Sequence, residues 1–162
     1  MAWLHRLDRL IGLIVAGAQW LALPLILLLF LQWPLRDIVR AYSTQANDLG
    51  QIFFALLVAV SISAATRTGM HLASDTLAQY YRPRTRDWIR RLGGGLALLP
   101  WAIFVLIASD AFVVPSVQEL ESFPETSNPG YFIIKICLWV MAVTVIAQAI
   151  VDIFRPLPRD DI

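Results

Sequence analysis

The sequence is poor in charge, cysteine and histidine. Charged residues make up 15% of the 162 residues and hydrophobic residues 58%, whereas an average soluble domain is about one quarter charged. The 13 Lys and Arg nearly balance the 12 Asp and Glu, leaving a net charge of +1, so no overall field favours nucleic acid. A single cysteine, Cys137, excludes an internal disulfide, and we expect it to be a small buried side chain within its apolar run.

Catalytic motifs are also missing. The chain contains no phosphate-binding loop, no His or Cys set with zinc spacing, and no nucleophile elbow. The segments between its apolar runs are too short for a soluble catalytic domain. The sequence therefore predicts that the protein is not an enzyme.

Long apolar runs are what the chain has instead. A helix needs about 20 apolar residues to cross the hydrocarbon of a bilayer, and four runs meet or approach that length. We predict an all-α integral membrane protein, a single membrane domain over residues 1–162. Its four transmembrane helices are expected at about 12–32, 49–66 with an extension to about 81, 94–114 and 131–152.

The arginines predict the orientation of these helices, because cytoplasmic loops carry an excess of Lys and Arg. Ten of the twelve arginines precede the first run, separate the second from the third, or follow the fourth. The opposite side has only Arg36 and Arg40, and it carries Glu119, Glu121 and Glu125. Both termini are therefore expected in the cytoplasm, with the first run as an uncleaved anchor.

Three short segments are amphipathic, with apolar residues on one helical face and charges elsewhere. They cover residues 3–11, 35–42 and 85–92, and their pattern predicts helices lying in the membrane interface. For residues 3–11 the sequence equally allows that the first transmembrane helix starts early.

Polar residues inside the runs each need a partner, because polar groups are costly in lipid. Gln19 lies mid-membrane and needs one on this chain or another. Asp110 and Lys135 lie toward the outer ends of their helices, where they either pair with each other or reach the surface.

A row of residues four apart runs from Gln51 along the second helix and ends in Arg67, His71 and Asp75. These three form a short polar stripe at the predicted cytoplasmic end. The stripe is either a binding or proton-handling site or a structural charge network that pairs with nearby arginines or a partner subunit. We favour the structural role.

The stretch Arg67-Thr-Gly-Met-His71-Leu-Ala-Ser-Asp75 resembles the small membrane subunit of tripartite ATP-independent periplasmic (TRAP) transporters. That family often has a Gly-x-His-hydrophobic-x-Val-Asp pattern here. Gly69, His71, Leu72 and Asp75 match it, whereas Ser74 replaces the usual aliphatic residue. The Leu7-Asp8-Arg9-Leu10 opening and the Pro124…Pro129-x-Tyr131 approach to the last helix are also similar.

This resemblance implies a non-enzymatic transport role in the bacterial cytoplasmic (inner) membrane. The implied partners are a large membrane subunit, which would carry the sodium and substrate sites, and a periplasmic substrate-binding protein. The small subunit would scaffold the large one, help dock the binding protein, and hold no cofactor itself, while the transported solute would be of the organic-acid type. Partner-contact candidates are then Arg67, His71, Asp75, Gln19, Gln51, Asp110 and Lys135, and periplasmic docking candidates are Arg36, Arg40, Glu119, Glu121 and Glu125.

Two other functions remain as alternatives. One is a haem- or quinone-binding membrane anchor of a redox enzyme, although His5 and His71 do not suggest a pair of axial ligands at matched depth. The other is a small transporter that assembles from copies of this chain alone.

Overall fold

The protein is all-helical in the computed structural model, which describes residues 2–38, 43–68 and 80–154. Four stretches are long and apolar enough to cross a membrane: Trp3–Pro34, Thr44–Arg67, Arg91–Gln118 and Tyr131–Phe154. This confirms the predicted fold class. The helices in chain order are α1 (Ala2–Gln19), α2 (Ala22–Asp37), α3 (Thr44–Thr68), α5 (Pro83–Gly93), a π-helical turn (Gly94–Leu98), α6 (Leu99–Gln118) and α7 (Tyr131–Phe154).

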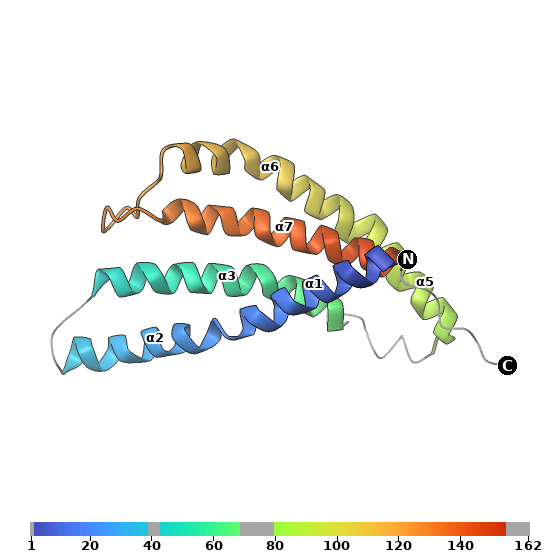
Figure 1. Cartoon of the computed structure of the whole chain (residues 1–162), viewed down its shortest axis with the longest axis horizontal. Helices are drawn as coiled ribbons and strands as arrows, with labels where there is room; N and C mark the ends of the chain where they lie inside the picture. Colours follow the sequence, from blue (N-terminus) through green and yellow to red (C-terminus); the bar gives the residue numbers. More distant parts are fainter. Residues whose placement is uncertain (1, 39–42, 69–79, 155–162) are drawn as a thin grey trace.

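The helix α7 lies at the centre of the arrangement. Figure 1 shows α6, α7, α3 and α2 side by side in one row, with α1 crossing α3 to reach α7. Of the span in α7, 44% is buried, against 11% in the span formed by α1 and α2. The helix α6 forms one edge of the row, where it packs against α7 and the π-helical turn.

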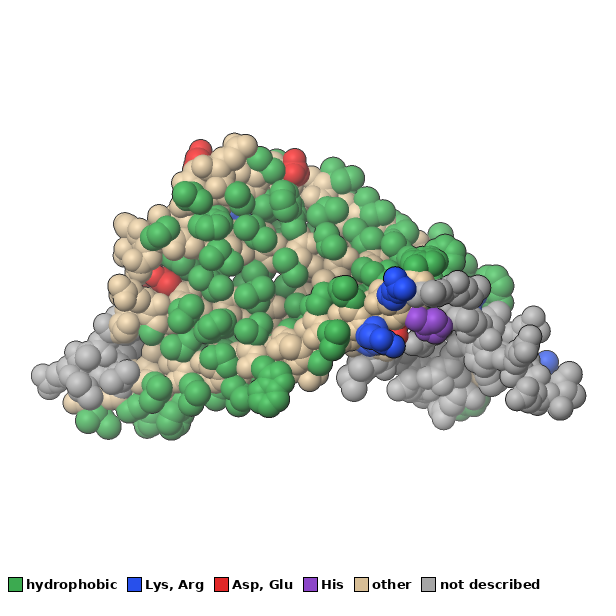
Figure 2. Space-filling model, viewed as in Figure 1, with side chains coloured by type: hydrophobic (Ala, Val, Ile, Leu, Met, Phe, Trp, Pro, Cys, Tyr) green, Lys and Arg blue, Asp and Glu red, His purple; other side chains and the backbone are tan. Residues whose placement is uncertain are grey.

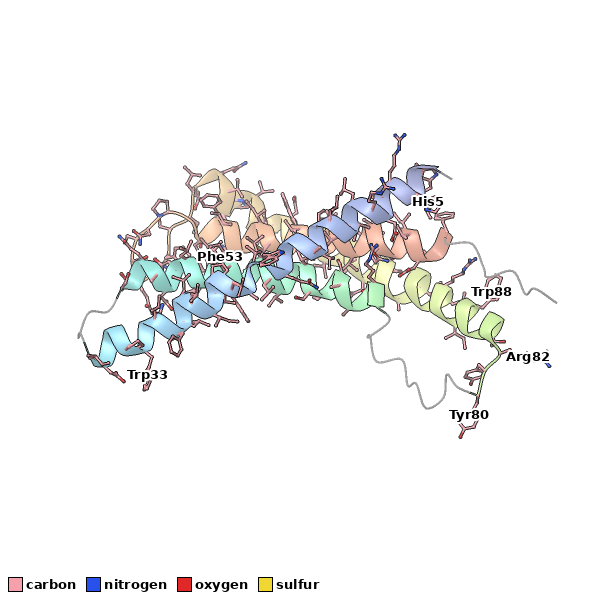
Figure 3. The ribbon with its side chains drawn as sticks, turned by 60° about the horizontal axis from the view of Figure 1, so that its bottom comes forward. His5, Trp33, Phe53, Tyr80, Arg82 and Trp88 are labelled. Atoms are coloured by element: carbon pink, nitrogen blue, oxygen red, sulfur yellow. The ribbon has the colours of Figure 1, made fainter. Side chains whose placement is uncertain are left out.

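The two ends of the row differ in their side chains, and we name them accordingly. The basic end comprises the start of α1, the end of α3, α5 and the end of α7, and the rings of Trp3 and Phe154 meet there at 6.4 Å. The loop end comprises the end of α2, the start of α3 and the loop 119–130. Figure 3 shows Trp33 at the loop end and Trp88 and Tyr80 at the basic end, which is the position of aromatic residues at membrane interfaces.

The first span is broken between α1 and α2, at Trp20 and Leu21. Pro24 has no N–H to donate to the carbonyl four residues earlier, and its ring crowds that carbonyl, which belongs to Trp20. The chain responds with tight turns, in which the N–H of Trp20 donates to Gly17 O at 3.1 Å and that of Leu21 to Ala18 O at 3.0 Å.

A second irregularity joins α5 to α6. The π-helical turn follows Gly93 and contains two further glycines, residues with low helix propensity, and Pro100 next removes an N–H from the first turn of α6. Gly95 lies beside Ile153 of α7, at a distance where a Cβ would make an ordinary van der Waals contact of 3.5 Å with Ile153 Cδ1.

The predicted interfacial helices have different outcomes. Residues 3–11 belong to α1, which runs unbroken from Ala2 to Gln19, so the first helix starts early. Residues 85–92 lie within α5 as a helix, with Trp88, Ile89 and Leu92 exposed. The third segment is partly in α2, and its residues 39–42 lie outside the described residues, as do residues 69–79 of the expected extension beyond α3.

Candidate functional site

Polar side chains at the loop end fasten the loop 119–130 to α3. The carboxylate Oδ2 of Asp48 accepts a hydrogen bond from Thr126 Oγ1 at 2.6 Å and another from Asn128 Nδ2 at 3.1 Å. Asp48 is only 7% exposed. A buried carboxylate that lost these donors would be costly, so the contact holds the loop against the start of α3.

A second contact fastens the same loop to α6 and α7. Glu121 accepts hydrogen bonds from the hydroxyl of Ser116 in α6 and from the ammonium of Lys135 in α7. These two donors, Lys135 first, lower the pKa of Glu121 below its ordinary value of 4.5. Lys135 Nζ also lies 5.5 Å from the centre of the Tyr131 ring, a cation–π distance.

The backbone of the loop is closely bonded to itself. At the end of α6, the N–H of Leu120 donates to Val117 O and that of Glu121 to Ser116 O, the pair of bonds of a Schellman motif. The N–H groups of Phe123 and Ser127 donate to Asn128 O and Phe123 O, each at 2.8 Å. The loop is thus a folded unit rather than an open connection.

Two non-glycine residues of this loop, Leu120 and Ser127, have positive φ. Leu120 occupies the left-handed position of the Schellman motif with φ 49°, where glycine is usual. Its side chain is 60% exposed, and Glu119, Pro124 and Glu125 are exposed nearby in sequence. The loop therefore presents an apolar side chain between acidic ones.

At the basic end, α3 and α1 meet through Arg67 and Asp8. Arg67 Nη1 donates to the backbone oxygen of Asp8 at 2.8 Å and lies 3.1 Å from its carboxylate Oδ1. Gly12 makes room for the guanidinium, because a Cβ there would lie 3.2 Å from Arg67 Nη2. Arg67 thus connects two helices of this chain.

The predicted polar stripe can be followed only at Arg67. His71, Asp75 and Arg40 lie outside the described residues, as does the side chain of Arg36. Arg67 bonds to Asp8, an acid on α1, and the role of the whole stripe stays a prediction.

Of the two alternatives for Asp110 and Lys135, the structure does not show the pairing with each other. Lys135 bonds to Glu121, because its long side chain reaches the loop end, whereas Asp110 is exposed on α6. Gln19 and Gln51 are exposed as well. Glu121 therefore binds side chains of its own chain, Ser116 and Lys135. Among the predicted docking residues, the exposed acids are then Glu119 and Glu125.

Several polar residues of these contacts were missed by sequence reasoning: Asp8, Asp48, Ser116, Thr126 and Asn128. A signal existed for Asp48, since an acid beside an apolar run needs a hydrogen-bond partner once it is buried. Inside the bundle, Ser63 Oγ and Gln148 Oε1 are buried without a hydrogen-bond partner. Within residues 2–38, 43–68 and 80–154, no three His, Cys, Asp or Glu side chains gather as metal ligands would.

Comparison with known families gives one match. The family model described as "Tripartite ATP-independent periplasmic transporters, DctQ component" matches residues 25–159. Neither a curated protein nor a solved structure matches the chain significantly.

The contact between α1 and α3 predicts different effects of leucine at two glycines of α1. Gly12→Leu should displace the Arg67 guanidinium and cost about 1–3 kcal/mol of stability, as overpacking does. Gly17→Leu is the matched control, because nothing lies within 4 Å of its Cβ position. Thermal unfolding of the detergent-solubilised protein, followed by size-exclusion fluorescence, measures both, and equal melting temperatures would contradict the prediction.

The Glu121 contact predicts a pH dependence of stability. Because its pKa is lowered in the folded protein, the ionised carboxylate stabilises the fold above pH 4.5, and this contribution is lost as the pH falls through the folded-state pKa. Glu121→Gln should be less stable than the wild type at neutral pH and converge with it in acid. Melting curves between about pH 7 and pH 3 test this.

The matched control is Glu119→Gln, which alters an exposed acid two residues away. It should follow the wild type throughout. A Glu121→Gln curve that ran parallel to the wild type at every pH would exclude the contribution of the ion pair.

Proposed function

Because the chain belongs to the DctQ component family of tripartite ATP-independent periplasmic transporters, we propose that it scaffolds the large membrane subunit and helps dock the periplasmic binding protein. The chain is a transporter subunit and not an enzyme, and its family implies both of these partners. Sodium coupling and an organic-acid-type solute belong to the proposal, with both sites on the large subunit and no cofactor in this chain.

The observation that supports docking is the folded loop at the loop end. Two polar contacts, at Asp48 and at Glu121, hold it to three helices. A surface held in one conformation loses little entropy on binding. Its exposed Leu120, Glu119 and Glu125 supply an apolar anchor flanked by negative charge, which suits a partner surface with a basic rim around an apolar patch.

The orientation in this proposal follows the distribution of charge. Arg6, Arg9, Arg67, Arg82 and Arg91 all lie at or near the basic end. Excess arginine favours the cytoplasmic side, so the loop end would face the periplasm, where the binding protein is.

The scaffold role is supported by the flat arrangement. Figure 2 shows apolar side chains over much of the face it draws, with acidic side chains near its upper and left edges and cationic side chains near the start of α1. A row of helices fixed beside a moving subunit enlarges the surface held by lipid and resists displacement of the part to which it is bound.

The family match favours this function over the redox anchor left open by the sequence. An absorbance spectrum of the purified chain separates the two, since a haem anchor would give a Soret band.

Co-purification tests the proposal. The tagged chain, expressed with the large membrane protein of its own system, should retain that protein in stoichiometric amount in mild detergent. The purified pair should then bind the periplasmic protein. Recovery of the folded tagged chain from this co-expression without the large protein would contradict the scaffold role.

Two variants test the loop in the same binding assay. Glu119→Lys/Glu125→Lys should weaken binding of the periplasmic protein by roughly tenfold at low salt, with less difference at high salt, because exposed charges are screened. Leu120→Gly should also weaken binding, yet raise the melting temperature, since glycine accepts the left-handed conformation without strain.

The opposite signs of the Leu120→Gly effects separate docking from folding. Gln118→Ala, an exposed change at the end of α6, is the control and should alter neither. Unchanged affinity in both loop variants would remove the loop from the docking surface.

A further inference from the structure

The acidic residue Asp110 is exposed on a transmembrane helix. It is the only acid in α6 (Leu99–Gln118), and its side chain faces outward from the bundle. In Figure 2, acidic side chains stand on the upper edge of the molecule, over α6, with apolar side chains around them. A carboxylate in this position is costly in lipid and marks a functional contact by default.

The depth of Asp110 follows from its neighbour. The adjacent Ser109 accepts a hydrogen bond from Trp139 Nε1 at 3.1 Å. Ser109 therefore lies at the same depth as Trp139, which is eight residues after Tyr131, the first residue of α7. Eight residues of helix span about 12 Å. A 24-residue helix such as α7 is about 36 Å long, so a core of about 30 Å centred on it begins about 3 Å from its end. Asp110 therefore lies within the hydrocarbon.

No cation of this chain's described part neutralises Asp110. The single lysine of the sequence is Lys135, and its ammonium bonds to Glu121 at the loop end. Arg67 bonds to Asp8 at the opposite end. An aspartate has only one methylene group between its backbone and its carboxylate, so it cannot extend to the interface as lysine does.

The neighbours of Asp110 describe the surface around it. Ile103 and Ile107 precede it by two turns and one turn on the same exposed side, and Ile107 is 69% exposed. Asp110 lies about a quarter turn from the row that packs on α7, which consists of Ala102, Ser109, Val113 and Ser116. The surface is thus an open flank of α6 at the edge of the row.

From this we propose that the flank of α6 around Ile103, Ile107 and Asp110 binds the large membrane subunit, which supplies a lysine, an arginine or another hydrogen-bond donor to Asp110 within the bilayer. This inference rests on the proposed function and assigns the face by which the scaffold is attached. Charge complementarity selects the occupant: lipid tails offer no donor. A parallel two-fold dimer through this flank would place two Asp110 carboxylates at the same depth in one interface, because both copies contribute the same surface patch.

The test compares three variants in the co-expressed complex. Asp110→Leu should retain at least about fivefold less large subunit per small subunit after a stringent detergent wash, a loss within the range of intramembrane hydrogen bonds. Asp110→Asn keeps an acceptor without the charge and should fall between Asp110→Leu and the wild type. Asp37→Leu is the matched control, since it removes an exposed carboxylate at the end of α2, and it should retain the large subunit fully.

A second measurement distinguishes loss of the contact from misfolding of the variant, since either would lower retention of the large subunit. The Asp110→Leu chain expressed alone should melt no lower than the wild type, because it loses a carboxylate exposed to detergent. A photo-cross-linking residue at position 107 should capture the large subunit.

The outcomes separate this inference from the function on which it rests. A wild-type chain that fails to retain the large subunit contradicts the proposed function. A wild-type chain that retains it, together with full retention by Asp110→Leu, overturns only the α6 contact. Cross-links from position 107 to lipid alone, or to a second copy of this chain, overturn it as well.

Discussion

The exclusion of charge from hydrocarbon is the constraint on which this structure depends. Among the described ionisable side chains of the spans, Lys135 reaches Glu121 at the loop end and Arg67 reaches Asp8 at the basic end. Both cations have long side chains, which let their charges lie at an end of the row while their backbones remain in the span. The middle is left to packing between apolar and small residues, such as Ala59 and Ser63 on α3 and Ala142 and Ala149 on α7.

Because the polar contacts lie at the two ends, each joins elements that are distant in sequence. Arg67 connects the end of α3 to the start of α1, and Asp48 connects the start of α3 to a loop almost 80 residues later. Apolar packing between transmembrane helices is only weakly directional, since lipid competes for the same surfaces. The paired ends therefore supply the register that the apolar middle lacks.

The sequence predicted the elements better than their contacts. Four spans follow from the length of apolar runs, and the weight of arginine at one end follows from their flanks. The partner of Lys135 did not follow, because two acids lay within plausible reach and the choice depends on how the loop after α6 folds back. The role of Gly12 did not follow either, because it accommodates a guanidinium from a residue 55 positions later.

The exposed carboxylate of Asp110 indicates that the fold of this chain is only part of a larger assembly. Three other charged residues have partners within the chain: Glu121, Asp48 and Arg67. Asp110 therefore differs from them in being exposed on its helix. It does not stabilise the chain alone, since an apolar residue would suit lipid better. An acid at this depth is stabilising only if a donor arrives from another protein. In the proposed scaffold role that protein is the large subunit, because neither lipid nor a second copy of this chain supplies a donor there. The same logic applies at the loop end, where Leu120 adopts a conformation that glycine would adopt without strain and presents an apolar side chain to solvent.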